Sequence, residues 1–260
     1  MRIALGVEFD GTDFCGWQQQ RTGRTVQGCL EEALTRVADH ELRTVCAGRT
    51  DTGVHATGQV VHFDSPAQRD VKAWIRGTNA NLPADIRVQW ARPVDEDFHA
   101  RFSARRRHYR YVILNAPCPS ALLRSRSCWE YPALDATRMA EGARHLLGKH
   151  DFSSFRAAAC QAKHPVRTLY QLEVLRQGDF LYIDVMANAF LHHMVRCIAG
   201  VLIRVGRGEA SPGWVAEVLA ARDRTLSGVT APAPGLYLVA VRYPERFDLP
   251  AGGWLPCYVR

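Results

Sequence analysis

Several marks of membrane, secreted and metal-binding proteins are missing from this sequence. No apolar run approaches the ~18 residues that a membrane helix needs, and Met1 leads directly into an alternating strand pattern without a leader segment. The eight cysteines form no CxxC pair and show no other metal-ligand spacing. We therefore expect a cytoplasmic protein with reduced thiols and no membrane contact.

Acidic residues are also few: 26 Asp and Glu stand against 33 Lys and Arg, which gives a formal net charge of +7. Most of the basic residues are arginine, whose guanidinium group binds phosphate through two parallel hydrogen bonds. The excess favours a polyanionic partner, although a modest positive charge also keeps proteins soluble without any such partner.

Strand and helix patterns alternate through residues 1–104. Ile3, Leu5, Val7 and Phe9 alternate with polar or small residues, as in a half-buried strand. The patterns that follow are a helix over 25–38, strands around 43–47 and 58–63, a helix near 70–77 and a strand over 86–90. This β-α-β-β-α-β order is that of the ferredoxin-like, or split βαβ, unit.

Residues 105–260 are expected to repeat that order in a second α+β half. The expected elements are strands at 108–114, 169–175, 180–187 and 236–241 and helices at about 135–147 and 189–205, with a further helix beginning at Ser211. Two such halves meeting near residues 103–106 predict a cleft between them as the working site.

The segment FSARRRHYRYVIL (102–114) mixes arginine with aromatic residues. Phosphates need cations and unstacked bases need flat surfaces, so this mixture is typical of RNA-binding segments, although it equally suits a solvated strand end. Because side chains alternate along a strand, Tyr109 and Tyr111 are expected on one face. His108 and Arg110 are expected on the other. The arginines are Arg105, Arg106, Arg107 and Arg110.

The predicted helix ANAFLHHMVRCIAGVLIRV (187–205) carries one continuous apolar stripe. Arg196 lies nearly opposite that stripe, beside Gly200 and Ile203, so this second side is expected to be covered as well. A covered arginine needs an anionic partner. His192 and His193 are neighbours in the sequence and would diverge by about 100° on a helix, which argues against a shared metal.

The stretch AGRTDTGVHATGQVVHF (47–63) supplies that anion. Asp51 is the natural partner of Arg196, with Arg49 as a second cation, and nearby cations keep a carboxylate ionised, as a nucleophile or base requires. Gly53 and Gly58 permit a tight turn and a close ligand. Two simpler interpretations stay open: an aspartate that bonds its own turn, and a structural ion pair.

Five motifs together resemble the tRNA pseudouridine synthase A family. They are FDGTDFCGWQQQ (9–20), AGRTDTGVHA (47–56), RRRHYRYVIL (105–114), NAFLHHMVRCIAG (188–200) and APGLYLVAVRYP (233–244). Their order and spacing agree from residue 3 to about 249. The resemblance implies two α+β halves with a long, mainly antiparallel sheet, helices packed on it and a central active-site cleft.

The resemblance also implies the reaction and the roles of the residues. Family members isomerise uridine to pseudouridine at positions 38, 39 and 40 of the tRNA anticodon stem and loop, as homodimers without cofactor or metal. Asp51 would be the catalytic aspartate with Arg49 beside it and Arg196 as its ion-pair partner. Tyr109 would stack on the target uracil and Leu236 would line the pocket. The mixture of arginine with aromatic residues, and not the resemblance, assigns Arg105, Arg107 and Arg110 to binding of the substrate tRNA.

Two other classes of function account less well for this sequence. An RNA-binding protein that remodels tRNA without chemistry would use the same basic surface, but it gains nothing from a carboxylate that repels phosphate. A metal-dependent nuclease needs clustered carboxylates, which this sequence does not show.

Overall fold

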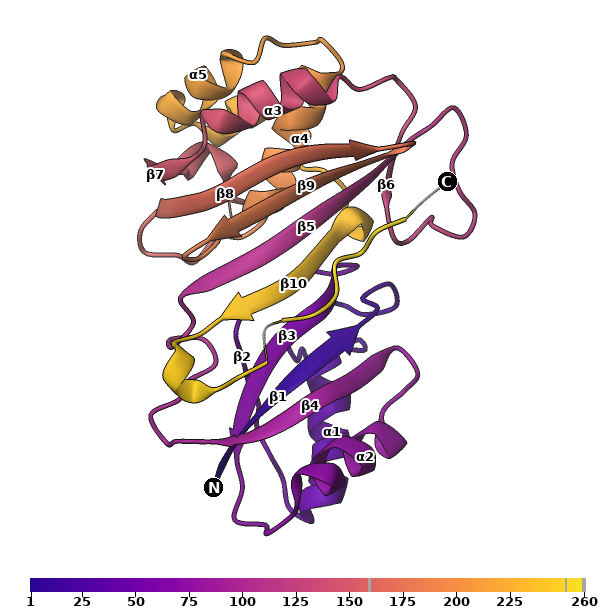
Figure 1. The fold of residues 1–260 in the computed structure, drawn as a ribbon, viewed down its shortest axis with the longest axis vertical. Coiled ribbons are helices and arrows are strands. Elements are labelled where there is room, and N and C mark those ends of the chain that lie inside the picture. The colour runs from indigo at the N-terminus through magenta and orange to yellow at the C-terminus, as the bar shows by residue number, and fades with distance from the viewer. Residues whose placement is uncertain (159, 251, 259–260) are drawn as a thin grey trace. The chain divides into compact units, whose positions relative to one another are not determined.

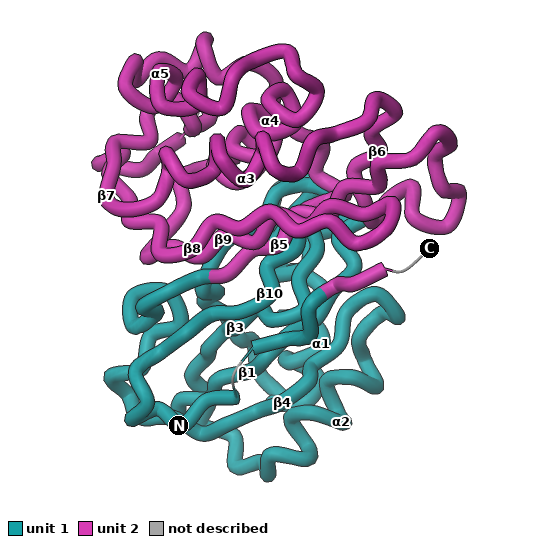
Figure 2. Tube along the Cα trace, turned by 45° about the horizontal axis from the view of Figure 1, so that its top comes forward, with its two compact units in different colours: residues 1–107, 237–255 teal, residues 108–236, 256–260 magenta. Residues whose placement is uncertain are grey.

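The computed structural model describes residues 1–158, 160–250 and 252–258. The chain forms two compact units, shown in different colours in Figure 2. The first unit contains Met1–Arg107 and Tyr237–Leu255, and the second contains His108–Leu236 and a short stretch from Pro256 onward. The chain first leaves the first unit after Arg107, close to the boundary predicted at residues 104 and 105. The stretch Tyr237–Leu255, which the sequence placed in the C-terminal half, lies in the first unit.

The first unit has the β-α-β-β-α-β order that the sequence predicted. Its elements are β1 (Arg2–Phe9), α1 (Val26–Ala38), β2 (Val45–Cys46), β3 (His55–Asp64), α2 (Val71–Asn81) and β4 (Ile86–Val94). Both helices begin at polar caps, because the side chain of Thr25 accepts a hydrogen bond from Gly28 N–H and that of Asp70 accepts one from Ala73 N–H.

The strands of the first unit are hydrogen-bonded in the order β4-β1-β3-β10, where β10 is Leu236–Arg242. Strand β1 is antiparallel to both β3 and β4. The two-residue strand β2 pairs only with the end of β3, where Val45 lies opposite His62. The beginning of β3 is therefore left for β10, which runs parallel to it with Tyr237 opposite His55. This pairing connects the closing strand to the first unit.

Helices α1 and α2 lie beside strands β1, β3 and β4 in Figure 1, and their apolar faces supply the core of this unit. Leu30 and Leu34 of α1 are completely buried. Trp74 of α2 meets Phe63 of β3 edge to face, with ring centroids 5.1 Å apart.

The second unit combines strands and helices in a longer order. Its elements are β5 (Arg106–Asn115), β6 (Cys128–Glu130), α3 (Ala136–Arg144), β7 (Gly148–Asp151), β8 (Val166–Gln177), β9 (Phe180–Ala187), α4 (Met194–Gly206) and α5 (Trp214–Ala221). The strands pair in the order β5-β9-β8-β7, with β6 added parallel to β5. Strands β8 and β9 form a hairpin in which Gln177 lies opposite Phe180, and Gly178 takes a positive φ of 56° in the turn.

The α+β class and the mainly antiparallel sheet pairing predicted from the sequence are confirmed. Several helix boundaries differ from the prediction. Helix α2 continues to Asn81, beyond the expected end near residue 77, and α5 begins at Trp214, after the expected start at Ser211. The helix expected from residue 189 begins at Met194, because His193 adopts a left-handed conformation with φ 62° that a helix cannot include. The helix expected to reach residue 147 ends at Arg144, and β7 follows it as a strand that the sequence analysis did not predict. Among the helices of the described residues, none is both long and apolar enough to span a membrane.

A buried ion pair joins β5 to β9 within the second unit. The guanidinium group of Arg110 donates to both carboxylate oxygens of Asp184, over 2.9 and 2.6 Å, and His108 reaches the same carboxylate at 3.2 Å. The predicted alternation is therefore correct, since His108 and Arg110 point to one face of β5. Burial opposes ionisation of Asp184, but the bonds from His108 and Arg110 outweigh it and lower the pKa of the carboxyl group below its usual value.

Replacing Asp184 by asparagine is expected to destabilise the protein by roughly 3–5 kcal/mol at neutral pH, because Arg110 would keep a buried charge without a counter-ion. Urea unfolding measures this loss. Glu173→Gln is the matched control, since Glu173 lies opposite Asp184 on β8 and is exposed. It should cost no more than about 0.5 kcal/mol.

The difference in free energy of unfolding between wild type and Asp184→Asn is also expected to depend on pH. The pKa of Asp184 is lower in the folded than in the unfolded protein, so its contribution is complete above about pH 4 and fades as the pH falls further through the folded value. Two results would contradict the buried ion pair of Asp184. One is an equal loss of stability in Asp184→Asn and Glu173→Gln, and the other is a loss in Asp184→Asn that grows as the pH falls.

Candidate active site

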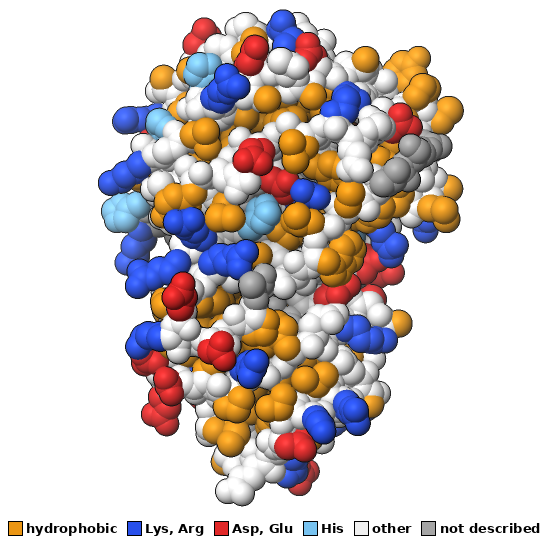
Figure 3. Space-filling view, viewed as in Figure 1, with side chains coloured by type: hydrophobic (Ala, Val, Ile, Leu, Met, Phe, Trp, Pro, Cys, Tyr) orange, Lys and Arg blue, Asp and Glu red, His pale blue; other side chains and the backbone are white. Residues whose placement is uncertain are grey.

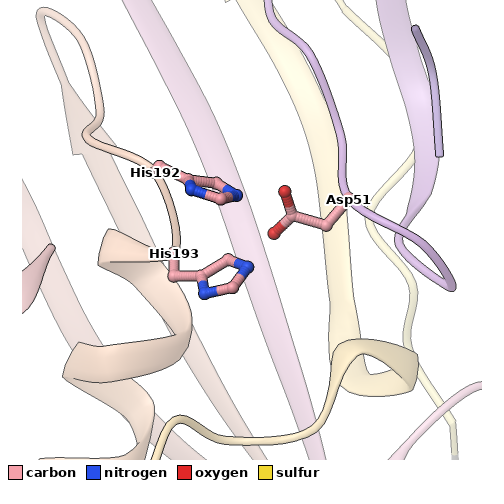
Figure 4. Close-up of side chains that lie close together, drawn as sticks. All are labelled: Asp51, His192 and His193. Atoms are coloured by element: carbon pink, nitrogen blue, oxygen red, sulfur yellow. The ribbon is translucent and has the colours of Figure 1, made fainter. Parts of the chain in front are cut away.

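Asp51 is the first residue of a tight turn that leads into β3 (Figure 4). The N–H of Val54 donates to the carbonyl oxygen of Asp51 over 3.1 Å, and Gly53 takes a φ of 76° at the third position. A positive φ at that position is the mark of a type II turn, and it explains the glycine. The carboxylate side chain is half-buried and Arg49 is exposed, so a dissolved substrate can reach both.

Two glycines of the FDGTDFCGWQQQ segment hold this turn from the other side. A Cβ atom on Gly11 would lie 2.0 Å from the carbonyl oxygen of Val54, and one on Gly16 would lie 2.9 Å from that of Thr50. Trp17 N–H also donates to the Thr50 carbonyl over 3.0 Å. Only glycine permits so close an approach of two backbones, so this segment fixes the position of the turn.

His55 completes the support of the turn at the start of β3. Its Nδ1 accepts a hydrogen bond from Gly11 N–H over 3.0 Å, and its buried ring stacks on Tyr237 of β10 with centroids 4.7 Å apart. Sequence patterns alone indicated no role for Gly11, Gly16 or His55. All three nevertheless lie within motifs that carry the family resemblance: the two glycines in FDGTDFCGWQQQ and the histidine in AGRTDTGVHA.

Arg107 anchors the chain just before the Asp51 turn. Its Nε and Nη2 donate to the carbonyl oxygen of Ala47 over 3.1 and 3.0 Å, and Nη2 also donates to that of Arg101 over 2.7 Å. The residue is 8% exposed. A guanidinium group held by backbone carbonyls in this way is placed to shape the loop, and its burial does not favour the predicted contact with tRNA phosphate.

The other two arginines predicted to bind phosphate differ from each other in exposure. Arg110 is buried in its ion pair with Asp184 and also donates to the carbonyl of Pro256, whereas the side chain of Arg105 is exposed. Of the three arginines predicted to bind tRNA, Arg105 is therefore the one that solvent reaches fully.

Arg196 stands in the first turn of α4, on the side predicted to be covered. Its Nε donates to the carbonyl of Ala231 over 2.8 Å, and Ala231 N–H donates back to the carbonyl of Arg196 over 3.1 Å. A Cβ atom on Gly200 would lie 2.1 Å from the carbonyl oxygen of Val229. Residues 229–231 therefore pack directly on this face, which confirms that it is covered.

The same segment positions Leu236, which begins β10 and is 6% exposed. Tyr111 donates its hydroxyl to the carbonyl of Pro232 over 2.8 Å, and Gly235 passes close to the carbonyl of Val112. Bonds to α4 and to β5 thus hold the chain on its way to Leu236.

Tyr109 lies on β5 of the second unit. The residue is 7% exposed, and its ring meets that of Phe190 edge to face with centroids 5.0 Å apart. This edge contact fixes the plane of the ring, as a surface for stacking a base requires.

His192 and His193 lie where the chain enters α4 (Figure 4). Their ring centroids are 4.0 Å apart. The expectation that the two rings diverge was wrong, because it assumed a helix that begins only after His193. That the protein uses no metal stays a prediction.

The charge of the surface agrees with a polyanionic partner. Figure 3 shows Lys and Arg side chains, interspersed with Asp and Glu, on the face that it draws. With a formal net charge of +7, the chain has the electrostatic character expected of a protein that attracts nucleic acid.

Comparison with known proteins identifies the class. The sequence profile of the family described as "tRNA pseudouridine synthase" matches residues 6–103 and 143–244. The chain belongs to this family, whose members are isomerases that convert uridine in tRNA to pseudouridine. The match includes the Asp51 turn and Arg196, and it confirms the resemblance drawn from the five motifs.

Individual relatives narrow the class to one enzyme type. The chain is 57% identical over 260 residues to a tRNA pseudouridine synthase A of Alcanivorax borkumensis, covering 98% of this chain and 97% of that protein. It is 57% identical over 250 residues to one of Nitrosococcus oceani, covering 96% of each. It is 52% identical over 259 residues to one of Colwellia psychrerythraea, covering 100% of each.

Gly16→Ala is expected to reduce pseudouridine formation by roughly tenfold or more, because the new Cβ would displace Thr50 and with it the Asp51 turn. Gly208→Ala is the matched control: Gly208 also has a positive φ, 78°, but a Cβ there meets nothing within 4 Å. Both variants should lose roughly 1 kcal/mol of stability through backbone strain. Activity that falls equally in both, measured on tRNA with each protein shown to be folded, would show that the contact with Thr50 is unimportant.

Proposed function

We propose that this chain isomerises uridine to pseudouridine at positions 38, 39 and 40 of the tRNA anticodon stem and loop, with Asp51 as the reacting group. The observation that carries the proposal is the presentation of the Asp51 carboxylate. It stands on a tight turn that two glycines and His55 fix from behind, and it remains accessible from solvent. A carboxylate that only tied two segments together would need no such accessibility.

The proposed reaction begins with extrusion of the target base, because the glycosidic bond is hidden in a paired stem. Asp51 then acts as nucleophile or base on the nucleoside, and the bond between N1 of uracil and C1′ of ribose breaks. The detached uracil turns over and its C5 bonds to C1′. The proton at C5 is then lost, and N1 gains a proton, so that the product is an isomer of the substrate. Water must be excluded meanwhile, since a detached uracil in contact with solvent would be lost.

Five further residues receive a role in this proposal. Arg49 and Arg196 are assigned to the carboxylate, which they orient. Tyr109 is assigned to the face of the uracil and Leu236 to the apolar wall that excludes water. Arg105 is assigned to tRNA phosphate because its side chain is exposed.

We also infer that the chain works in the cytoplasm as a homodimer and needs no cofactor and no metal. These are properties of the family that the five motifs resemble. Sedimentation at a concentration near that of the assay tests the dimer separately from the chemistry.

Asp51→Asn is expected to abolish pseudouridine formation while tRNA affinity stays within about threefold, since the amide has the same shape but cannot act as nucleophile or base. Pseudouridine is counted in a nuclease digest of the treated tRNA, and affinity is measured by filter binding. Turnover above a few per cent of wild type, in protein free of contaminating enzyme, would refute the role of Asp51.

Tyr109→Phe is expected to leave tRNA binding intact and to slow the final step, because it keeps the ring and removes the hydroxyl. In a site closed to water few other groups can take the C5 proton, since arginine stays protonated. Tritium release from C5-labelled uridine measures that step. Tyr109→Leu removes the ring as well and should weaken productive binding by about one to two orders of magnitude. Tritium release at the wild-type rate by the phenylalanine variant would leave Tyr109 with stacking alone.

A further inference from the structure

Phe102 is an exposed aromatic residue that the proposed reaction does not use. It lies in the loop of residues 98–103, between β4 and β5 in the first unit, and 75% of its surface is exposed. Leaving a phenylalanine ring in water costs about 1.5–3 kcal/mol relative to burying it. A ring held in that position is therefore a candidate contact for a partner.

The backbone of this loop is fixed by several hydrogen bonds. Nδ1 of His99 accepts from the N–H groups of Arg101 and Phe102, both over 3.2 Å. The N–H of Ala100 donates to Nδ1 of His62 over 3.1 Å, and Tyr243 donates its hydroxyl to the carbonyl of Ala100 over 2.6 Å. The exposed ring thus projects from a pre-organised loop, so that binding to it loses little conformational entropy.

The ring of Phe102 is itself positioned by its neighbours. It stacks on His99 with centroids 4.3 Å apart and planes tilted by 30°, and the guanidinium carbon of Arg101 lies 5.5 Å from its centroid. Burial, with the nearby charge of Arg2, lowers the pKa of His99 and keeps its ring neutral at physiological pH. An aromatic pair of this kind, with arginine beside it, offers the flat and weakly cationic surface on which nucleobases stack.

The charges around Phe102 fit a nucleic acid. Arg101, Arg105 and Arg106 all have exposed side chains, and they lie within four residues of Phe102 along the chain. Cations next to an exposed aromatic ring match the two halves of a nucleotide, because the phosphate needs charge and the base needs a flat surface.

This loop is joined to the Asp51 turn by a single guanidinium group. Arg107 donates to the carbonyl of Arg101, next to Phe102, and to that of Ala47, four residues before Asp51. One side chain therefore holds both segments within the first unit. One of these segments continues into Phe102, and the other leads into the Asp51 turn.

We propose that Phe102 is a substrate-binding residue whose ring stacks on an unpaired base of the tRNA anticodon loop other than the target uridine. The assignment rests on the proposed function, since it takes tRNA as the substrate. It adds a second aromatic contact besides Tyr109, on a different unit of the chain. This contact orients the loop before the target base is extruded.

Phe102→Ala is expected to raise the KM for tRNA about tenfold with a smaller effect on kcat, as loss of one base stack implies. Phe102→Trp should restore the wild-type KM, because it keeps an aromatic surface. Leu122→Ala is the matched control: Leu122 is 85% exposed and lies in the second unit, so its loss should leave the KM unchanged.

A binding comparison separates stacking from a merely structural effect. An anticodon stem-loop and a fully paired duplex of the same stem are titrated against wild type and Phe102→Ala. Weaker binding of the stem-loop alone supports the assignment. Equal weakening of both RNAs, an unchanged KM, or failure of tryptophan to restore it would overturn the assignment. The proposed function fails by a different result, namely absence of pseudouridine in the wild-type reaction.

Discussion

The close contact of two backbone segments in the first unit is the constraint on which the site depends. Gly11 and Gly16 bring one segment against the carbonyl groups of Val54 and Thr50, and side chains at either glycine would push the segments apart. A catalytic carboxylate must be held to within a fraction of an ångström relative to its substrate. The glycines of one motif thus serve the aspartate of another, although some 35 residues separate them in the sequence.

Arginine has three different uses in this chain, and the sequence alone did not distinguish them. Arg110 is buried against a carboxylate, Arg107 is buried against backbone carbonyls, and Arg105 is exposed. All three lie in one short run, so composition and spacing suggest one role for all. Their different environments come from strands that lie far away in the sequence: Asp184 stands on β9 and Ala47 precedes β3. Only the folded chain shows which guanidinium groups remain for a substrate.

Local patterns predicted much of the fold, and failures occurred where tertiary contacts decide. Alternation placed His108 and Arg110 on one face of a strand, and periodicity gave the β-α-β-β-α-β order of the first unit. The start of α4 was placed too early, because periodicity does not reveal the left-handed conformation of His193. The pairing of β10 with the start of β3, at an edge that the two-residue strand β2 leaves open, joins segments far apart in the sequence and is not visible in local patterns. At the site, motif and charge pointed to Asp51. The supporting glycines also stand in a motif, but their role and that of the Phe102 loop follow from contacts between segments far apart in the sequence.

The central claim is that a carboxylate of this chain isomerises uridine in tRNA without a metal or cofactor. The most direct measurement is incubation of the purified protein with unmodified tRNA in excess EDTA, followed by mapping of pseudouridine along the RNA. The account predicts pseudouridine at positions 38, 39 and 40, at the same rate with and without EDTA. Unchanged uridine at those positions, or activity that disappears on chelation and returns with added metal, would contradict it.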